Sequence, residues 1–595
     1  MERKEIAERF RWNTSALFAN DAAWEEEYKQ MEKESEEYDY SVFANLADKA
    51  TLLACLNRVD EVSRKMESLY IYAHLRHDED VRNSETTSAL ARISALSSRV
   101  FAQLAFIEPQ LTALDEDVLN AFIKDPDFAA HEYKLRKTAQ SKAHVLSGAE
   151  EKLLALGGDV LGGFQDVFMM LDNANLNLPK AQFNGEETQM SHGLYGLVLR
   201  SKNAAERKEW FEKYYASYIR LIDAITQTYY GNVKKNVFYK TVRNYDSCRA
   251  MAMDGEDVNP IVYENLLKAT HNALPSMHKY VSLRKKVLGL DEQHMYDMYV
   301  PLVEDAELAL PFDEAYDLVV KGLAPLGKEY QALLEKARTE RWIDVHENEG
   351  KRNGAYSAGS YDAPHPYVLL NYQPSMNDVF TIAHEMGHAL HTYKSNHAQP
   401  YAKAGYTIFL AEIASTVNEV LLLKYMYNES KDVTFKKYLL NYYMDTFRAT
   451  LFRQTQFAEF EQIAHEKAEN GEALTKESLN EAYYELNKKY YGDGVVHDKE
   501  IAYEWARIPH FYNAFYVYKY ATGIISAISI VKRILTERES AVKDYFEFLS
   551  AGGSDDPVSI LKRAGVDLTT DAPFKAAMEE FENTLREFEE LIIEK

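Results

Sequence analysis

Apolar side chains recur every three or four positions along most of this chain, which is the spacing of one face of an α-helix. The stretches with this pattern are rich in Ala, Leu, Glu and Lys and poor in Pro, so a mainly α fold is expected. A helix start is indicated at Ser147-Gly-Ala-Glu150, and Gly157-Gly158 is expected to end that helix. Long helices are predicted at Ala50–Leu75, Ser88–Leu114 and Asp571–Glu594.

Strand signals are restricted to two regions of the chain. The first covers residues 163–199, with turns expected at 175–179 and 184–187. The second covers residues 342–372 and ends in Tyr367–Tyr372, a short apolar run between two prolines. Two interpretations of that run remain open: a strand edge to which a peptide adds, or an ordinary buried strand.

Residues 384–388 read His-Glu-Met-Gly-His, an H-E-x-x-H motif that chance would produce fewer than about 0.1 times in such a chain. Ser375-Met-Asn-Asp378 predicts a helix start just before it. On a helix, His384 and His388 share one face and can bind one metal ion. Glu385 lies beside them and can take a proton from a metal-bound water. The motif therefore indicates a catalytic zinc site.

Gly387 lies between the two histidines of this predicted helix. Glycine inside a helix costs about 1 kcal/mol relative to alanine, so its presence needs a physical reason. The reason expected here is the close approach of another backbone or of substrate.

A third ligand is needed, because catalytic zinc usually takes three protein ligands. The pattern that adds a histidine six residues after the second is excluded, because Lys394 occupies that position and His391 replaces its glycine. Glu412 lies in an apolar run, where an unpaired carboxylate would be costly. Glu412 is therefore the expected ligand, with Glu419 as the alternative ligand or a supporting partner. Ser415 can orient Glu412 or a histidine, and the competing interpretation pairs Glu412 with a Lys or Arg.

Several blocks of sequence resemble the M3 family of zinc oligopeptidases. This is the thimet oligopeptidase and neurolysin group, and the resemblance is specifically to its oligoendopeptidase F branch. It is strongest from about residue 200 to the C-terminus, and weaker in the N-terminal third. The blocks are HEMGHALH at 384–391, FLAEIAST at 409–416, GAYSAGSYDAPHPYVLLNY at 354–372, IPHFYNAFYVYKYATG at 508–523, and the segments 549–554 and 564–567.

The resemblance implies a multi-lobed helical zincin, with a small β-sheet beside the zinc helix and a deep substrate channel between helical lobes. It implies one Zn2+ ion held by His384, His388 and Glu412, with Glu385 as general base and later proton donor. Residues 1–198 would form the N-terminal helical region, and residues 199–595 the catalytic domain. The expected substrates are short unstructured peptides.

Members of this family have a His and Tyr cluster that stabilises the oxyanion of the reacting carbonyl. Tyr518 is the best match here, followed by His510 and Tyr512, and Tyr520 lies in the same segment. The spacing from His510 to Tyr518 is shorter than in the thimet branch. Most aromatic residues in such runs only pack, which is the competing interpretation. Expected substrate contacts are Tyr516 and the segment Gly354, Ala355 and Tyr356, whereas His365 is expected to be a rigid turn residue.

Composition narrows the remaining function classes. The net charge of −25 argues against nucleic acid and anionic membranes as partners. Two distant cysteines, Cys55 and Cys248, predict neither a disulfide framework nor a thiolate metal site. The first residues lack the apolar core of a signal peptide, and the longest apolar run, Thr522–Val531, is too short to span a bilayer. A soluble, cytoplasmic protein is expected, and no oligomeric state is predicted.

The expected activity is hydrolysis of internal peptide bonds. Two alternatives remain: a zinc-containing peptide-binding protein without turnover, and a zinc hydrolase of non-peptide amides. The intact Glu385 weighs against the binding protein, because binding needs no base at that position.

Overall fold

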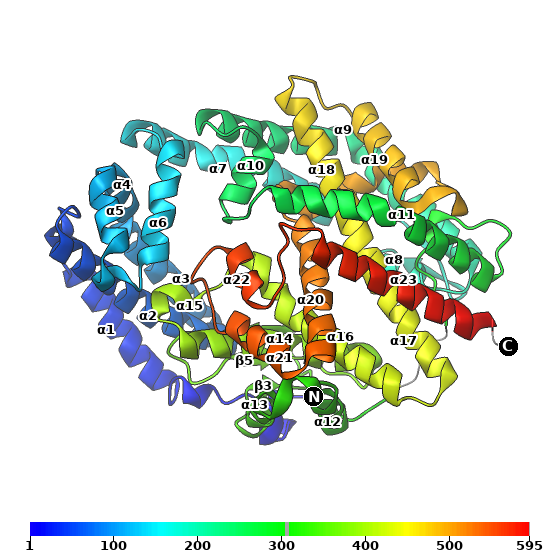
Figure 1. Cartoon of the computed structure of the whole chain (residues 1–595), viewed down its shortest axis with the longest axis horizontal. Helices are drawn as coiled ribbons and strands as arrows, with labels where there is room; N and C mark the ends of the chain where they lie inside the picture. Colours follow the sequence, from blue (N-terminus) through cyan, green and yellow to red (C-terminus); the bar gives the residue numbers. More distant parts are fainter. Residues whose placement is uncertain (304–308, 594–595) are drawn as a thin grey trace. The chain divides into compact units, whose positions relative to one another are not determined.

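The computed structural model describes residues 1–303 and 309–593 and consists mainly of helices (Figure 1). The predicted fold class is confirmed, because 73% of the chain is helical and the sheets among the described residues are small. The chain forms two compact units. Unit 1 is made of Met1–Val145, Glu307–Met426 and Ile530–Val566, and unit 2 of Leu146–Ala306, Tyr427–Ser529 and Asp567–Lys595. The division at residue 198 and the channel between lobes stay predictions.

The N-terminal part of unit 1 is a set of helices around one apolar core. Its helices are α1 (Asp21–Glu37), α2 (Lys49–Glu79), α3 (Ser84–Leu104), α4 (Ile107–Ala113), α5 (Glu116–Lys124) and α6 (Glu132–Ser141). The predicted helix Ala50–Leu75 lies within α2. The helix predicted at Ser88–Leu114 is instead broken at Ala105 and Phe106. Pro109 explains the break, since it has no N–H to donate to the carbonyl of Ala105 and fits only in the first turn of a new helix.

A three-stranded sheet lies next to the motif helix α14 (Met376–Ala398), which begins after Ser375 as predicted. Its strands are β3 (Ile343–Asp344), β4 (Tyr356–Ala358) and β5 (Tyr367–Leu369), in the order β3-β5-β4. β3 is parallel and β4 antiparallel to β5, and both β4 and β5 pack against α14. β5 is the buried central strand, so the run at 367–372 offers no free edge; β4 is the edge strand on one side.

The remaining helices of unit 1 surround α14. They are α12 (Phe312–Gly322), α13 (Gly327–Thr339), α15 (Tyr401–Ala404), α16 (Ile408–Glu429), α21 (Glu539–Leu549) and α22 (Pro557–Arg563). α14 and α16 cross at Gly387, where an added Cβ would lie 2.5 Å from the Cα of Ser415. The close backbone approach expected from this glycine is therefore confirmed.

Unit 2 contains longer helices and one hairpin. Its helices are α7 (Gly148–Met170), α8 (His192–Val198), α9 (Ala204–Val242), α10 (Cys248–Asp254), α11 (Ile261–Leu288), α17 (Val433–Thr446), α18 (Arg453–Glu469), α19 (Lys476–Tyr491), α20 (Tyr518–Glu537, whose second half belongs to unit 1) and α23 (Ala572–Ile593). α23 matches the predicted helix at 571–594, whose last residue, Glu594, lies outside the described residues.

Two expectations for residues 147–199 need correction. The capping box at Ser147 is present, but α7 continues through Gly157-Gly158 to Met170. The reason is tertiary: α7 packs along α9, and the ring of Phe164 occupies the space where a Cβ of Gly231 would lie. Strand structure is limited to the antiparallel pair β1 (Lys180–Phe183) and β2 (Glu186–Gln189), while the flanking apolar runs are helical. The turn at 184–187 is confirmed, with positive φ at Asn184 and Gly185.

Both cysteines are buried and unpaired, in agreement with the absence of a predicted disulfide. Two helical stretches, Ser84–Ala113 and Gly148–Asn175, are long and apolar enough to cross a membrane by length and composition alone. Core helices of water-soluble proteins meet the same criterion, so this is weak evidence for a membrane span.

Candidate metal centre

Three side chains from two crossing helices meet at one point in unit 1. His384 and His388 come from α14 and Glu412 comes from α16. The two Nε2 atoms are 3.2 Å apart, and Glu412 Oε2 lies 3.4 Å from His384 Nε2 and 3.3 Å from His388 Nε2. Zinc–ligand bonds of about 2.0–2.2 Å place two corners of a tetrahedron about 3.3–3.6 Å apart. The three donors therefore have the chemistry and the spacing of a metal site.

Neighbouring residues fix the orientation of these donors. Glu419 Oε1 lies 2.8 Å from His384 Nδ1, so in the neutral imidazole that nitrogen carries the proton and Nε2 keeps its lone pair. The Ser415 hydroxyl lies 2.9 Å from the Glu412 carbonyl and 3.2 Å from Glu412 Oε2. Glu419 contacts the side of the His384 ring opposite to Nε2, and it is not one of the three donors that meet at one point.

The electrostatics of the site favour an ionised Glu412. Burial alone would raise the pKa of its carboxyl, but the hydrogen bond and charge of His388, with the charge of His384, lower that pKa to about 2. For His384, burial acts to lower the pKa and contact with Glu419 raises it to about 9. The carboxyl groups of Glu412 and Glu419 therefore strongly favour a positive charge on the groups that they contact. The ion-pair partners of Glu412 in the described part of the chain are the two histidines rather than a Lys or Arg.

Glu385 lies on α14 beside the two histidines and is only 7% exposed. Its Oε2 is buried and has no hydrogen-bond partner among the described residues. Burial raises the pKa of this carboxyl, against the opposing effect of His384 and His388. An unpaired carboxylate oxygen with a raised pKa, next to a metal site, is suited to accept a proton.

Two other residues of α14 have different partners. The ring of His391 is 1% exposed and stacks on Tyr406, with ring centres 3.8 Å apart. Lys394 forms an ion pair with Glu329. His391 is therefore a packing residue. This is consistent with the exclusion of the pattern in which a third histidine ligand follows six residues after the second.

The residues predicted to stabilise an oxyanion all belong to unit 2, and the structure divides them into two groups. Tyr518 is 1% exposed, and its ring packs on that of Tyr263. Tyr512 is also buried, and its hydroxyl lies 2.7 Å from Thr228 Oγ1. His510 is exposed, and its ring lies near those of Tyr516 and Tyr520.

The second group, here called the 510 cluster, consists of the exposed His510 and the half-buried Tyr516 and Tyr520. The ring centre of His510 is 6.0 Å from that of each tyrosine, and the two tyrosine rings are 5.5 Å apart. Tyr520 Oη lies 3.4 Å from His510 Nε2. Tyr520 is not among the ranked oxyanion residues predicted from the sequence; its spacing of four residues from Tyr516 is the signal that could have identified it.

The residues predicted to line a substrate groove lie at or next to the edge strand β4. Gly354 has φ +88°, its carbonyl accepts a hydrogen bond from Asn371, and Ala355 follows it. Tyr356 begins β4, and its hydroxyl donates to Asp78 Oδ2 at 2.9 Å. His365 is buried and stacks on Trp342, with ring centres 4.9 Å apart, which fits the predicted structural role.

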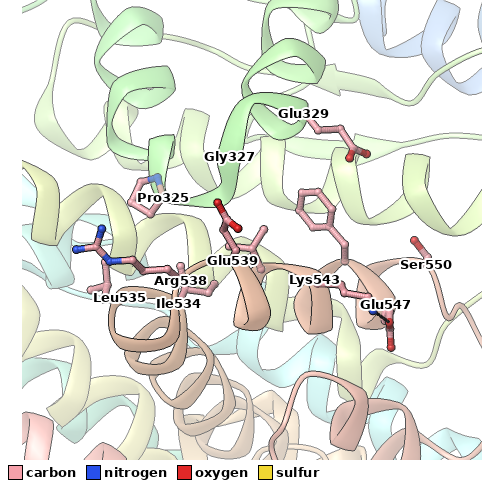
Figure 2. A pocket seen from close by; sticks show the side chains of 12 residues that line it. Pro325, Gly327, Glu329, Ile534, Leu535, Arg538, Glu539, Lys543, Glu547 and Ser550 are labelled. Carbon is pink, nitrogen blue, oxygen red and sulfur yellow. Dashed lines mark ion pairs between the residues drawn. The ribbon is translucent and has the colours of Figure 1, made fainter.

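A cavity of about 820 Å³ also opens on unit 1, between α13 and the helices α20 and α21 (Figure 2). Its lining combines apolar side chains with both Arg538 and Lys543 and the acidic residues Glu539 and Glu547. None of the three metal-site donors lines it. The candidate site is therefore identified by its donor set and not by this cavity.

Comparisons with known proteins agree with this geometry. The family model "Peptidase family M3" matches residues 197–580, and the model "Oligopeptidase F" matches residues 110–177. Oligopeptidase PepF of Bacillus subtilis is 42% identical over 595 residues, covering 100% of this chain and 88% of the relative. A crystal structure of oligoendopeptidase-F from Enterococcus faecium has a TM-score of 0.74 at 35% identity and covers 97% of this chain and 99% of its own. The crystal structure of a Chlamydophila abortus protein reaches a TM-score of 0.93 at 35% identity, with 99% of each chain covered. This chain belongs to peptidase family M3, in its oligoendopeptidase F branch, and is a metallo-oligopeptidase.

Proposed function

We propose that this enzyme is a zinc-dependent endopeptidase that hydrolyses internal bonds of short unstructured peptides. His384, His388 and Glu412 are the proposed zinc ligands. The observation that carries this proposal is their mutual spacing of 3.2–3.4 Å, close to the edges of a tetrahedron around zinc. Membership of family M3 supports the same conclusion.

A zinc ion held there would supply a Lewis acid that polarises the scissile carbonyl and activates water. Glu385 acts as the base: it accepts a proton from the attacking water and returns it to the leaving amine. Its buried, unpaired Oε2 supports this role, since the atom has no competing hydrogen bond in the described part of the chain. Glu419 keeps the proton of His384 on Nδ1, which leaves Nε2 available to the ion.

The oxyanion needs a hydrogen-bond donor, and we propose that segment 508–520 supplies it. His510 and Tyr516 are accessible, which favours His510 as a donor and Tyr516 as a substrate contact. Tyr518 and Tyr512 stay candidates for the same role, although both hydroxyl-bearing side chains are buried in this structure. Replacement of each tyrosine by phenylalanine separates them, because loss of one oxyanion donor lowers kcat by about 10²–10³.

We also propose that a peptide adds to the β4 edge near Gly354, Ala355 and Tyr356. β4 pairs with β5 on one side only, so the described sheet leaves its other side available. The two family matches, at 110–177 and 197–580, support a division between an N-terminal region and a catalytic domain near residue 198.

The test is hydrolysis of a pool of short peptides, with a folded protein and a long unfolded chain as comparisons. We expect internal cleavage of the short peptides alone, lost with a chelator and restored by zinc. Glu385→Gln should bind zinc and peptide but lose turnover. Retained turnover in that variant contradicts the role of Glu385, and a zinc-loaded wild type that cleaves nothing would indicate a binding protein instead.

A further inference from the structure

Phe515 has a backbone conformation that aromatic residues rarely adopt. Its φ is +55°, in the left-handed region that favours glycine, and its side chain is 2% exposed. Phe515 separates the buried Tyr512 from the half-buried Tyr516 along the same segment. Such a conformation has an energetic cost and persists only where the surroundings hold it.

A buried acid on α18 stabilises this conformation of Phe515. Glu461 is 0% exposed, and its Oε1 accepts a hydrogen bond of 3.0 Å from the backbone N–H of Phe515. Its other carboxyl oxygen has no partner among the described residues. Burial raises the pKa of this carboxyl to about 8, so the group is mostly neutral at pH 7. A buried acid with a single backbone contact is costly as a packing residue, because an apolar side chain would fill the same space without that cost.

The surroundings of Glu461 are themselves fixed. His465, one turn further along α18, has Nδ1 2.8 Å from the Glu461 carbonyl, so this nitrogen carries the proton. Its Nε2 then accepts a hydrogen bond of 3.0 Å from the Asn236 side chain. The His465 ring packs on the ring of Phe515, with centres 4.8 Å apart. The left-handed turn of the chain at Phe515, called the reversal below, is thus held in two ways. Its backbone amide donates to Glu461, and its ring packs on His465.

We propose that Glu461 is a positioning residue, which holds the reversal at Phe515 and thereby brings the rings of the 510 cluster together. His510 precedes the reversal and Tyr516 and Tyr520 follow it, so contact among the three rings depends on this turn of the chain. The contribution to catalysis rests on the proposed function, in which segment 508–520 meets the substrate. Glu461 itself contacts the backbone of that segment and not the 510 cluster.

The test compares Glu461→Gln with Glu461→Leu. Gln keeps an oxygen that can accept from Phe515, whereas Leu has a similar size and no acceptor. We expect kcat of Glu461→Leu to fall at least tenfold with KM changed less than threefold, and Glu461→Gln to stay within threefold of wild type. Leu135→Ala, which opens a cavity in the apolar core at α6 of unit 1, serves as the control for general destabilisation and should keep wild-type kcat well below its Tm.

Hydrogen exchange provides a readout that does not depend on activity. The amides of residues 511–518 should exchange at least tenfold faster in Glu461→Leu and at the wild-type rate in Glu461→Gln, while zinc content stays equal. If Glu461→Leu keeps wild-type exchange, or if Glu461→Gln loses as much kcat as Glu461→Leu, the proposal is overturned. If wild type hydrolyses no peptide, the proposed function fails, and the exchange comparison still decides whether Glu461 holds the segment.

Discussion

The crossing of α14 and α16 makes Gly387→Ala a sensitive test of how the metal site is built. An alanine Cβ at this position would lie 2.5 Å from Ser415 Cα and 2.7 Å from the Ala414 carbonyl oxygen, and real Cβ contacts essentially never fall under 3.0 Å. The neighbours are backbone atoms, so a side-chain rotation cannot relieve the clash. The helices must separate by at least about 0.5 Å, the difference between 3.0 and 2.5 Å.

This separation acts directly on the donor set. Glu412 lies one turn before Ser415 on α16, so its Oε2 should retreat from the two histidines by a similar amount. The present spacing of 3.3 and 3.4 Å would become about 3.8–3.9 Å. Metal–ligand distances tolerate only about 0.2 Å, so zinc affinity is expected to fall more than tenfold. The overpacked crossing should also lower the free energy of unfolding of the metal-free protein by about 1–3 kcal/mol.

The assay is competition for zinc against a chelator of known affinity, together with urea unfolding of the metal-free protein. Gly162→Ala is the matched control, because Gly162 is also inside a helix but has no atom within 4 Å of an added Cβ. That variant should gain up to about 1 kcal/mol of stability and bind zinc normally. Wild-type zinc affinity and unfolding in Gly387→Ala would refute the argument that this glycine sets the helix spacing.

Three further predictions concern substitutions of acidic and basic side chains. Glu419→Ala removes the partner of His384 and should weaken zinc binding 10–100-fold in the same competition assay; unchanged affinity would contradict its orienting role. The pKa of Glu461 is raised from 4.5 to about 8, so its contribution to stability is complete below pH 4.5 and is lost as the pH rises through 8. Glu461→Gln should therefore show a smaller loss of unfolding free energy between pH 5 and 8 in urea titrations, and a slope equal to that of wild type would refute this. Lys351→Met breaks a fully buried ion pair of 2.8 Å with Asp344 and should cost about 3–5 kcal/mol by urea unfolding; a cost below about 1 kcal/mol would show that the pair is dispensable.

The grouping of His384, His388 and Glu412 could be predicted because its information is local in sequence. The capping pattern at Ser375 fixes the helix start, and the two histidines follow on one face. Glu412 was identified because a carboxylate within an apolar run needs a partner. Spacing along α16 alone allows Glu419 to be either a ligand or a supporting partner, and its distance of 2.8 Å to His384 Nδ1 favours the supporting role.

The incorrect or incomplete predictions involve contacts between distant segments. Gly157 and Gly158 indicate a helix end, but α7 continues because it packs on α9. The division of the 508–520 segment into buried and half-buried tyrosines depends on the positive φ of Phe515. No propensity predicts that conformation for phenylalanine, since Glu461, more than fifty positions earlier, holds it.

The assembly of each unit from three separate segments has a consequence for biosynthesis. Unit 1 needs both Met1–Val145 and Ile530–Val566, so the ribosome must make residues up to 566 before that unit can be complete. At about 5–20 residues per second, its first helices wait on the order of half a minute to two minutes for their last partners. The proposed metal donors and their partner Glu419, by contrast, all lie between residues 384 and 419. The newly made chain therefore carries all the proposed metal donors before either unit can finish folding, and the apolar faces of its first helices stay without their last partners during this interval.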